Sequence, residues 1–146
     1  MIIYMDSCCY NRIFDDISQK RVRNEKKVIS DIFSYCVSGK YSLVASNILD
    51  IEIARIKDLE KRQNVEEIYR KYTNIHIFFD KESKKRSNEI RSISNIKDFD
   101  SYHLACAQKA NAEAFLTTDD RLIKMASKLD LGFQVINPVD FIKGGD

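Results

Sequence analysis

The sequence alternates short apolar segments with longer segments of helical periodicity. Five short segments are rich in β-branched and aromatic residues, which is typical of strands, and they cover residues 2–5, 41–45, 75–79, 114–117 and 133–136. Between them, apolar residues recur every three or four positions, as in the run from Val28 to Val37. Strands that alternate with helices favour a parallel sheet, because parallel neighbours need a long crossover connection. We therefore predict an α/β fold whose central, mainly parallel five-stranded sheet is covered by helices on both faces.

Nothing in the chain marks a boundary between domains. It has 146 residues, the usual length of one domain, with a single proline and four glycines, three of them in the last fifteen residues. Apolar residues make up 44% and charged residues 32%, a balance that suits a folded core with a solvated surface. We predict one domain over residues 1–146. No apolar run approaches the roughly 20 residues that span a bilayer, so we expect a cytoplasmic protein with no membrane partner.

The four cysteines and two histidines do not form a zinc-ligand pattern. No C-x-x-C pair occurs, and His76 and His103 lie far apart in the sequence. We expect the cysteines to be buried, reduced thiols. The net charge of +2 is too small to indicate a nucleic-acid-binding protein by itself. Two local basic stretches, residues 21–27 and 81–91, are either solvated helix faces or phosphate-contacting surfaces.

Acidic side chains follow four of the predicted strands. They occur at Asp6, at Asp50 and Glu52, at Asp80, and at Asp119 and Asp120. Ligands of open α/β sheets bind outside the carboxyl ends of the strands, so these acids gather on the binding edge. Converging carboxylates raise one another's pKa values unless a cation such as Mg²⁺ lies between them. Such a cation supports metal-assisted hydrolysis of a phosphodiester, although each acid taken alone is also a suitable helix N-cap.

Three segments resemble the acidic motifs of the PIN domain family, particularly the VapC-like toxins of bacterial toxin–antitoxin pairs. They are IIYMDSCCYN, SNILDIEIARI and FDSYHLACAQKANAEAFLTTDDRLIKMA. The third is the most specific, because an acid opens a helix, H-L-A follows three residues later, and a short strand then leads into T-T-D-D-R-L. The resemblance extends from residue 2 to about residue 142 and therefore covers nearly the whole chain.

The resemblance implies a three-layer α/β/α sandwich and a ribonuclease that depends on Mg²⁺ or Mn²⁺. By position in the motifs, the catalytic and metal-binding acids are Asp6, Glu52, Asp100 and Asp119. Asp6 is expected to be a direct metal ligand. The supporting polar residues suggested beside these acids are Ser7, Asn11, Thr117, Thr118 and Asp120.

Two of these acids have competitors nearby in the sequence. Asp50 precedes Glu52 by two residues, about 200° around a helix, so only one of the two can face the site. The family pattern selects Glu52. Asp98 similarly precedes Asp100, and we expect Asp98 to lie before the helix proper. The motif FDSYHLA aligns with Asp100 as the functional acid.

Basic residues are expected to approach the RNA. Arg12, Arg21 and Arg23 lie just past the first acid, where phosphate contact and solvated surface charge are both good interpretations. His103 lies beside Asp100 on an apolar helix face, where a packed core histidine is favoured over a general base.

The resemblance also implies partners for this chain. A VapC-like toxin would bind an RNA substrate and a small antitoxin whose tail covers the acidic site, and it would form a homodimer. The alternative function is a catalytically weak PIN-like module that binds protein or RNA. The presence of all four acids argues against this alternative.

Overall fold

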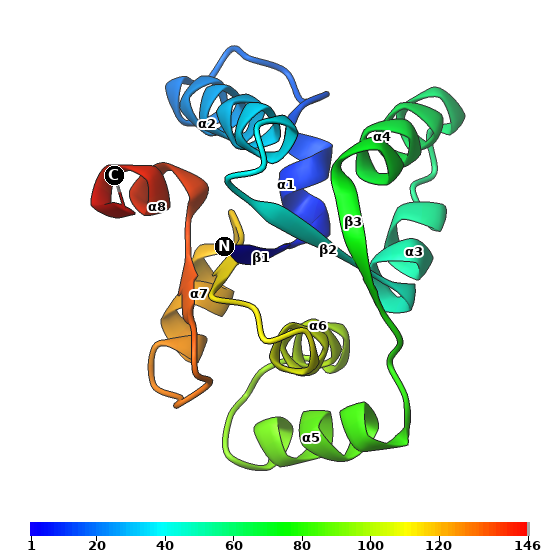
Figure 1. The fold of residues 1–146 in the computed structure, drawn as a ribbon, viewed down its shortest axis with the longest axis vertical. Helices are drawn as coiled ribbons and strands as arrows, with labels where there is room; N and C mark the ends of the chain where they lie inside the picture. Colours follow the sequence, from blue (N-terminus) through cyan, green and yellow to red (C-terminus); the bar gives the residue numbers. More distant parts are fainter. Residues whose placement is uncertain (146) are drawn as a thin grey trace.

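The computed structural model describes residues 1–145, within which the chain forms one five-stranded sheet and eight helices (Figure 1). The strands are β1 (Ile2–Met5), β2 (Ser42–Ser46), β3 (Thr73–Ile77), β4 (Ala114–Leu116) and β5 (Gln134–Ile136). The helices are α1 (Ser7–Arg12), α2 (Lys20–Val37), α3 (Asn47–Ala54), α4 (Leu59–Tyr72), α5 (Lys81–Ser92), α6 (Asp98–Lys109), α7 (Asp120–Ala126) and α8 (Pro138–Gly145).

All neighbouring strands run parallel, in the order β3-β2-β1-β4-β5. The predicted α/β fold with a parallel five-stranded sheet is confirmed, and the ends of each strand fall within two residues of the prediction. The central strand β1 is buried on both faces, since Ile3, Tyr4 and Met5 are all 0% exposed. Its continuous apolar sequence therefore reflects its position between two helical layers.

Helices cover both faces of the sheet and complete the three-layer sandwich (Figure 1). α1, α2 and α4 contact one another on one face, and α5 packs against α6 on the other. α3 contacts α1, α4 and α6, so it lies between the two helical layers. None of the helices within the described residues is long and apolar enough to cross a membrane.

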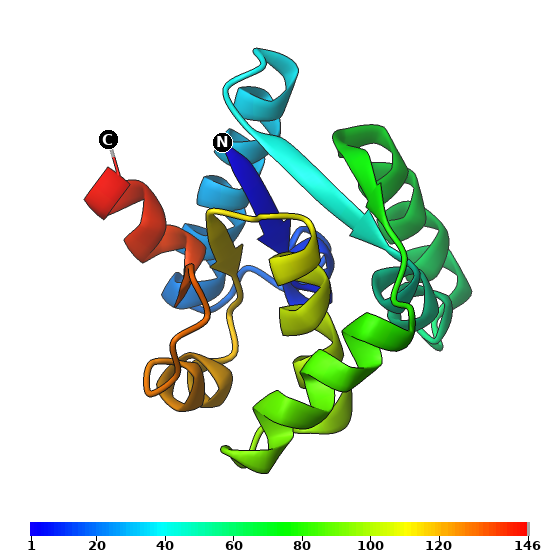
Figure 2. The same ribbon diagram turned by 60° about the horizontal axis from the view of Figure 1, so that its bottom comes forward.

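The strand order reverses between β1 and β4, and this point positions the site. From β1 the chain winds outward through β2 and β3, and it then returns to the other side of β1 for β4 and β5. Figure 2 shows the arrowheads of β1 and β2 pointing toward the same end of the molecule. Met5 pairs with Leu116 at the ends of β1 and β4, so Asp6 and Thr117 emerge side by side. A crevice at such a reversal is the usual binding site of an open α/β sheet.

Candidate metal centre

Asp6 is held at the carboxyl end of β1 by two hydrogen bonds. It is the N-cap of α1, where its Oδ1 accepts from the backbone N of Ser7 at 2.8 Å. Its Oδ2 accepts from the buried hydroxyl of Thr117 at 3.0 Å. The residue is only 6% exposed, and burial raises the pKa of Asp6 above its ordinary value. The carboxylate is therefore fixed in place, while burial disfavours its charged form.

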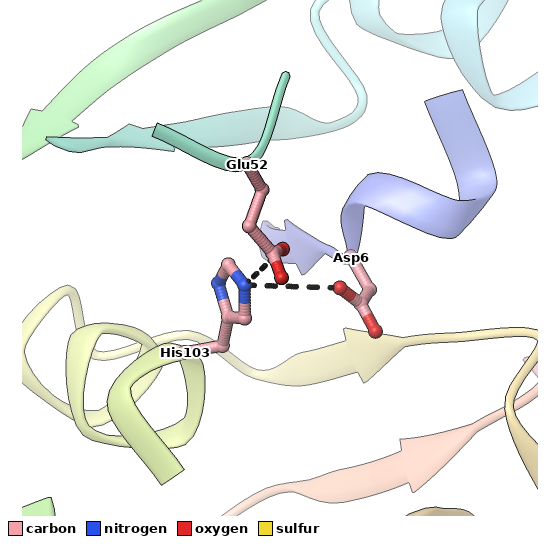
Figure 3. A group of neighbouring side chains, drawn as sticks. All are labelled: Asp6, Glu52 and His103. Carbon is pink, nitrogen blue, oxygen red and sulfur yellow. Dashed lines mark hydrogen bonds and ion pairs between the residues drawn. The ribbon is translucent and has the colours of Figure 1, made fainter. Parts of the chain in front are cut away.

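Glu52 and His103 form a three-residue group with Asp6, and Figure 3 shows their side chains converging. Ser7 Oγ donates to Glu52 Oε1 at 2.9 Å, and His103 Nε2 lies 2.6 Å from the same oxygen. His103 Nε2 is also 4.0 Å from Asp6 Oδ1. One ligand atom from each of the three residues lies within 4.8 Å of the other two. The end of β1, helix α3 and helix α6 therefore each position one side chain that can bind a metal.

The charges within this group balance one another. Burial raises the pKa of Glu52, but the hydrogen bond and charge of His103 outweigh burial and lower it overall. Burial lowers the pKa of His103, but the Glu52 and Asp6 carboxylates outweigh burial and raise it overall. The two shifts have the signs of an ion pair, in which a protonated imidazole offsets one carboxylate.

His103 also ends a buried chain of hydrogen bonds. Its Nδ1 lies 2.6 Å from the Tyr4 hydroxyl, which lies 2.8 Å from Ser46 Oγ. Ser46 is the N-cap of α3, and both His103 and Tyr4 are 0% exposed. The burial of His103 was predicted from the sequence, but its contact with Glu52 was not. The three-residue spacing from Asp100 places both side chains on one face of a helix and was the available signal.

α6 directs Asp100 toward the group, while Asp98 lies on the surface. The helix begins at Asp98, so the expectation that Asp98 precedes the helix was wrong. Asp98 is exposed and pairs with Arg91 Nη1 at 2.6 Å. Asp100 is half-buried, and its pKa is raised to about 6, first by burial and then by the charges of the other three predicted acids. Asp100 therefore lies close enough to those acids to feel their charge.

Glu52 and Asp50 face different parts of the protein, as their spacing on a helix requires. Asp50 Oδ1 accepts from the Tyr69 hydroxyl on α4 at 2.7 Å, away from the group around Asp6. The geometry thus separates the competing acids of α3 in the same way as those of α6.

Asp119 lies at the rim of the site and caps α7. Its Oδ1 accepts from the backbone N of Arg121 and of Leu122, at 3.0 and 3.2 Å. Its own backbone N donates to Thr117 Oγ1 at 3.1 Å, so Thr117 links Asp119 to Asp6. Asp119 is exposed and, like Asp100, lies outside the group within 4.8 Å. Asp119 therefore both caps α7 and lies at the rim of the site.

The remaining supporting residues surround the loop after β4. Thr118 donates its backbone N to Cys8 Sγ at 3.4 Å, and its carbonyl accepts from Arg21 Nη2 at 2.9 Å. Asp120 accepts two hydrogen bonds from Arg21, at 2.8 and 2.9 Å. The buried Oδ1 of Asn11 has no hydrogen-bond partner within residues 1–145. Of the supporting residues, Ser7 and Thr117 are the ones that hydrogen-bond to the predicted acids.

The three arginines suggested for RNA contact are engaged with protein groups. Arg12 and Arg21 each place Nε 3.0 Å from a carboxylate oxygen of the buried Glu25. Arg23 Nη1 donates to the carbonyl of Ile17 at 2.8 Å. Arg21 remains 49% exposed, so its outer edge is open to solvent.

The donor set suits a divalent cation. Carboxylate oxygens are the ligands that Mg²⁺ and Mn²⁺ prefer. Asp6 and Glu52 supply them within the group, and Asp100 lies near enough for the charges of Asp6, Glu52 and Asp119 to raise its pKa. Asp6 and Asp100 both have raised pKa values, and each would return toward its ordinary value beside a cation.

The sequence matches the family model described as PIN domain over residues 3–128. The chain belongs to the PIN domain family. This PIN domain shares its fold with a chain in the crystal structure of VapBC2 from Rickettsia felis bound to a DNA fragment from their promoter. The TM-score is 0.65 at 16% identity, over 94% of this chain and 98% of that chain. No curated protein matches the sequence significantly.

We predict that the metal-free PIN domain is more stable near pH 5 than near pH 7.5. The pKa of Asp100 is about 6 in the folded protein, above its ordinary value of 3.8. A raised carboxyl pKa contributes stability while the group is neutral, and that contribution is lost as the pH rises through about 6. Thermal melting in EDTA across this range measures the effect.

Two variants isolate the contribution of Asp100 to this pH dependence. Asp100→Asn should flatten the pH dependence of the melting temperature, because the titrating carboxyl is gone. Asp98→Asn should retain it, since Asp98 is an exposed acid two residues away on the same helix. An unchanged slope in Asp100→Asn would show that other groups carry the effect.

Proposed function

We propose that this PIN domain, taken as one domain over residues 1–146, hydrolyses RNA phosphodiester bonds with the help of Mg²⁺ or Mn²⁺. The observation that carries the proposal is the grouping of Asp6, Glu52 and His103 at the reversal of strand order, with Asp6 buried and the pKa of Asp100 raised to about 6 by burial and by the neighbouring acids. Membership of the PIN domain family supports the same chemistry.

The residues of the site would have different roles in this reaction. Asp6, Glu52, Asp100 and Asp119 would hold the cation. A bound cation of this kind lowers the pKa of a water ligand and neutralises charge that develops on the phosphodiester. Thr117 keeps Asp6 in position through its hydroxyl, and Ser7 does the same for Glu52. The protein would supply no covalent nucleophile.

We further propose that the protein is the toxin of a toxin–antitoxin pair acting in the cytoplasm. Support comes from the VapC-like motifs of the sequence and from the fold shared with a chain of the VapBC2 structure. On this proposal the partner is a small antitoxin whose tail places a basic side chain among the carboxylates. The toxin itself would be a homodimer.

Withdrawal of the cation tests the nuclease directly. Purified protein should cut a pool of transfer, ribosomal and messenger RNA with Mg²⁺ or Mn²⁺. Cleavage should stop in EDTA and resume when the cation is restored in excess. Asp98→Asn serves as the control and should cut like the parent, because Asp98 is paired with Arg91 on the surface. If well-folded protein cuts no RNA with either cation, the catalytically weak binding module becomes the better description.

A further inference from the structure

His103 places a nitrogen among the carboxylates of the proposed metal centre. Its Nε2 lies 2.6 Å from Glu52 Oε1 and 4.0 Å from Asp6 Oδ1, and Figure 3 marks both contacts with dashed lines. Ligands about 2.1 Å from an octahedral cation lie about 3 Å apart at adjacent positions and about 4 Å apart at opposite ones. The two separations from His103 Nε2 therefore differ from these values by a few tenths of an ångström, and the ligand atoms of Asp6 and Glu52 lie within 4.8 Å of each other.

We propose that His103 Nε2 is a direct metal ligand, and that it makes this centre select Mn²⁺ over Mg²⁺. The inference rests on the proposed metal centre and deepens it. Mg²⁺ takes oxygen ligands almost exclusively, whereas first-row transition cations also accept imidazole nitrogen. A site that contains only carboxylate ligands would not favour Mn²⁺ over Mg²⁺ in this way. The nitrogen of His103 would therefore create the preference for Mn²⁺.

The chain of hydrogen bonds behind His103 is suited to a metal-binding histidine. Ligating histidines usually donate their other ring N–H to a fixed acceptor, which orients the ring. Here Nδ1 lies 2.6 Å from the Tyr4 hydroxyl, and both side chains are 0% exposed. Tyr4 in turn lies 2.8 Å from Ser46 Oγ. The acceptor is therefore held in place by the core and does not depend on solvent.

This chain keeps its hydrogen bonds when Nε2 gives up its proton. Without a cation, the protonated imidazole donates from Nε2–H to Glu52 and from Nδ1–H to Tyr4, and Tyr4 donates to Ser46. With a cation on Nε2, Nδ1–H still donates to Tyr4, and Tyr4 still donates to Ser46. Ser46 Oγ also accepts from the backbone N of Leu49 at 3.1 Å, which holds it in place in both states. The hydrogen bonds of Nδ1 and of Tyr4 therefore persist when the cation binds.

The test compares the affinities for Mn²⁺ and Mg²⁺ by titration calorimetry at about pH 7.5. The parent should bind Mn²⁺ at least about 10-fold more tightly. His103→Gln should lose at least about 10-fold of the Mn²⁺ affinity, as loss of a direct ligand costs no less than loss of its support. Its Mg²⁺ affinity should change by less than about 3-fold. An unchanged Mn²⁺ to Mg²⁺ ratio in His103→Gln overturns the proposal.

His76→Gln is the matched control, because His76 is the other histidine of the chain and is exposed on β3. It should leave both affinities unchanged. A second measurement needs no variant: ¹⁵N spectra of the parent, titrated with diamagnetic Zn²⁺, should show Nε2 losing its proton while Nδ1 carries one. If Nε2 keeps its proton when Zn²⁺ is bound, His103 is not a ligand, and the proposal falls.

The outcomes separate this inference from the proposed function. A His103-dependent preference for Mn²⁺ in a protein that cuts no RNA would support the metal ligand and overturn the nuclease. Metal-dependent cutting with an unchanged affinity ratio in His103→Gln would support the nuclease and overturn the role of His103.

Discussion

Replacing Asp6 with asparagine is expected to reduce RNA cleavage by at least about 100-fold. Loss of residues that merely support a metal ligand costs about 10- to 100-fold, so loss of a direct ligand costs more. The substitution removes the charge that would attract the cation but keeps the shape of the side chain. Asp6 is also the innermost of the four acids, at 6% exposure, so water cannot easily replace its oxygen.

The same substitution should leave the melting temperature level or higher in metal-free buffer. Asparagine is as good an N-cap as aspartate, so the bond from the backbone N of Ser7 to the side-chain oxygen can persist. Burial raises the pKa of Asp6, which means that the folded protein holds this charge at a cost. Removing the charge removes that cost.

Initial cleavage rates with Mn²⁺ and thermal melting in EDTA together measure both effects. Asp58→Asn is the matched control, because Asp58 caps α4 through the backbone N of Lys61 at 3.0 Å and is exposed. It should change neither rate nor melting temperature appreciably. Full activity of Asp6→Asn would exclude Asp6 as a metal ligand. A marked fall in its melting temperature would instead identify Asp6 as mainly a structural cap.

The sheet could be predicted because a buried strand has a recognisable apolar sequence. β1 reads as an unbroken apolar run, since both of its faces are covered. The place of Asp6 follows from β1, because the residue after a central parallel strand opens onto the binding edge. Helix geometry also predicts that only one of Asp50 and Glu52 can face the site, but the choice of Glu52 came from the family pattern and not from the geometry.

The partners of His103 could not be predicted from periodicity. Tyr4 and His103 are separated by 99 residues, and their contact depends on how α6 docks against β1. A periodic pattern tells which face of a helix is buried, but it does not tell which atom of the neighbouring strand that face meets. The stretch RVRNEKK of α2 shows the same limit. Its charges indicate a solvated or phosphate-contacting surface, but one of its residues, Glu25, is 1% exposed.

Glu25→Gln is expected to lower the free energy of unfolding by about 2–3 kcal/mol. Breaking a fully buried ion pair costs about 3–5 kcal/mol, and the smaller value applies here because Arg12 and Arg21, exposed by 21% and 49%, regain water. Glu25 Oε2 accepts from Arg21 and from Asn137, at 3.0 and 2.7 Å. A glutamine amide turned toward these donors would face them with a donor of its own.

Urea unfolding of Glu25→Gln, with Asp31→Asn as the control, measures this cost. Asp31 lies on the same helix and pairs with Lys27 at 3.2 Å, but both side chains are exposed, so its loss should change stability by less than about 1 kcal/mol. Equal effects in the two variants would mean that Glu25 contributes no more than a surface charge. Cleavage by folded Glu25→Gln should fall far less than in Asp6→Asn. Arg21 then loses Glu25 as a partner, but it keeps its hydrogen bond to the carbonyl of Thr118 after β4, and Thr117 keeps its hydrogen bond to Asp6.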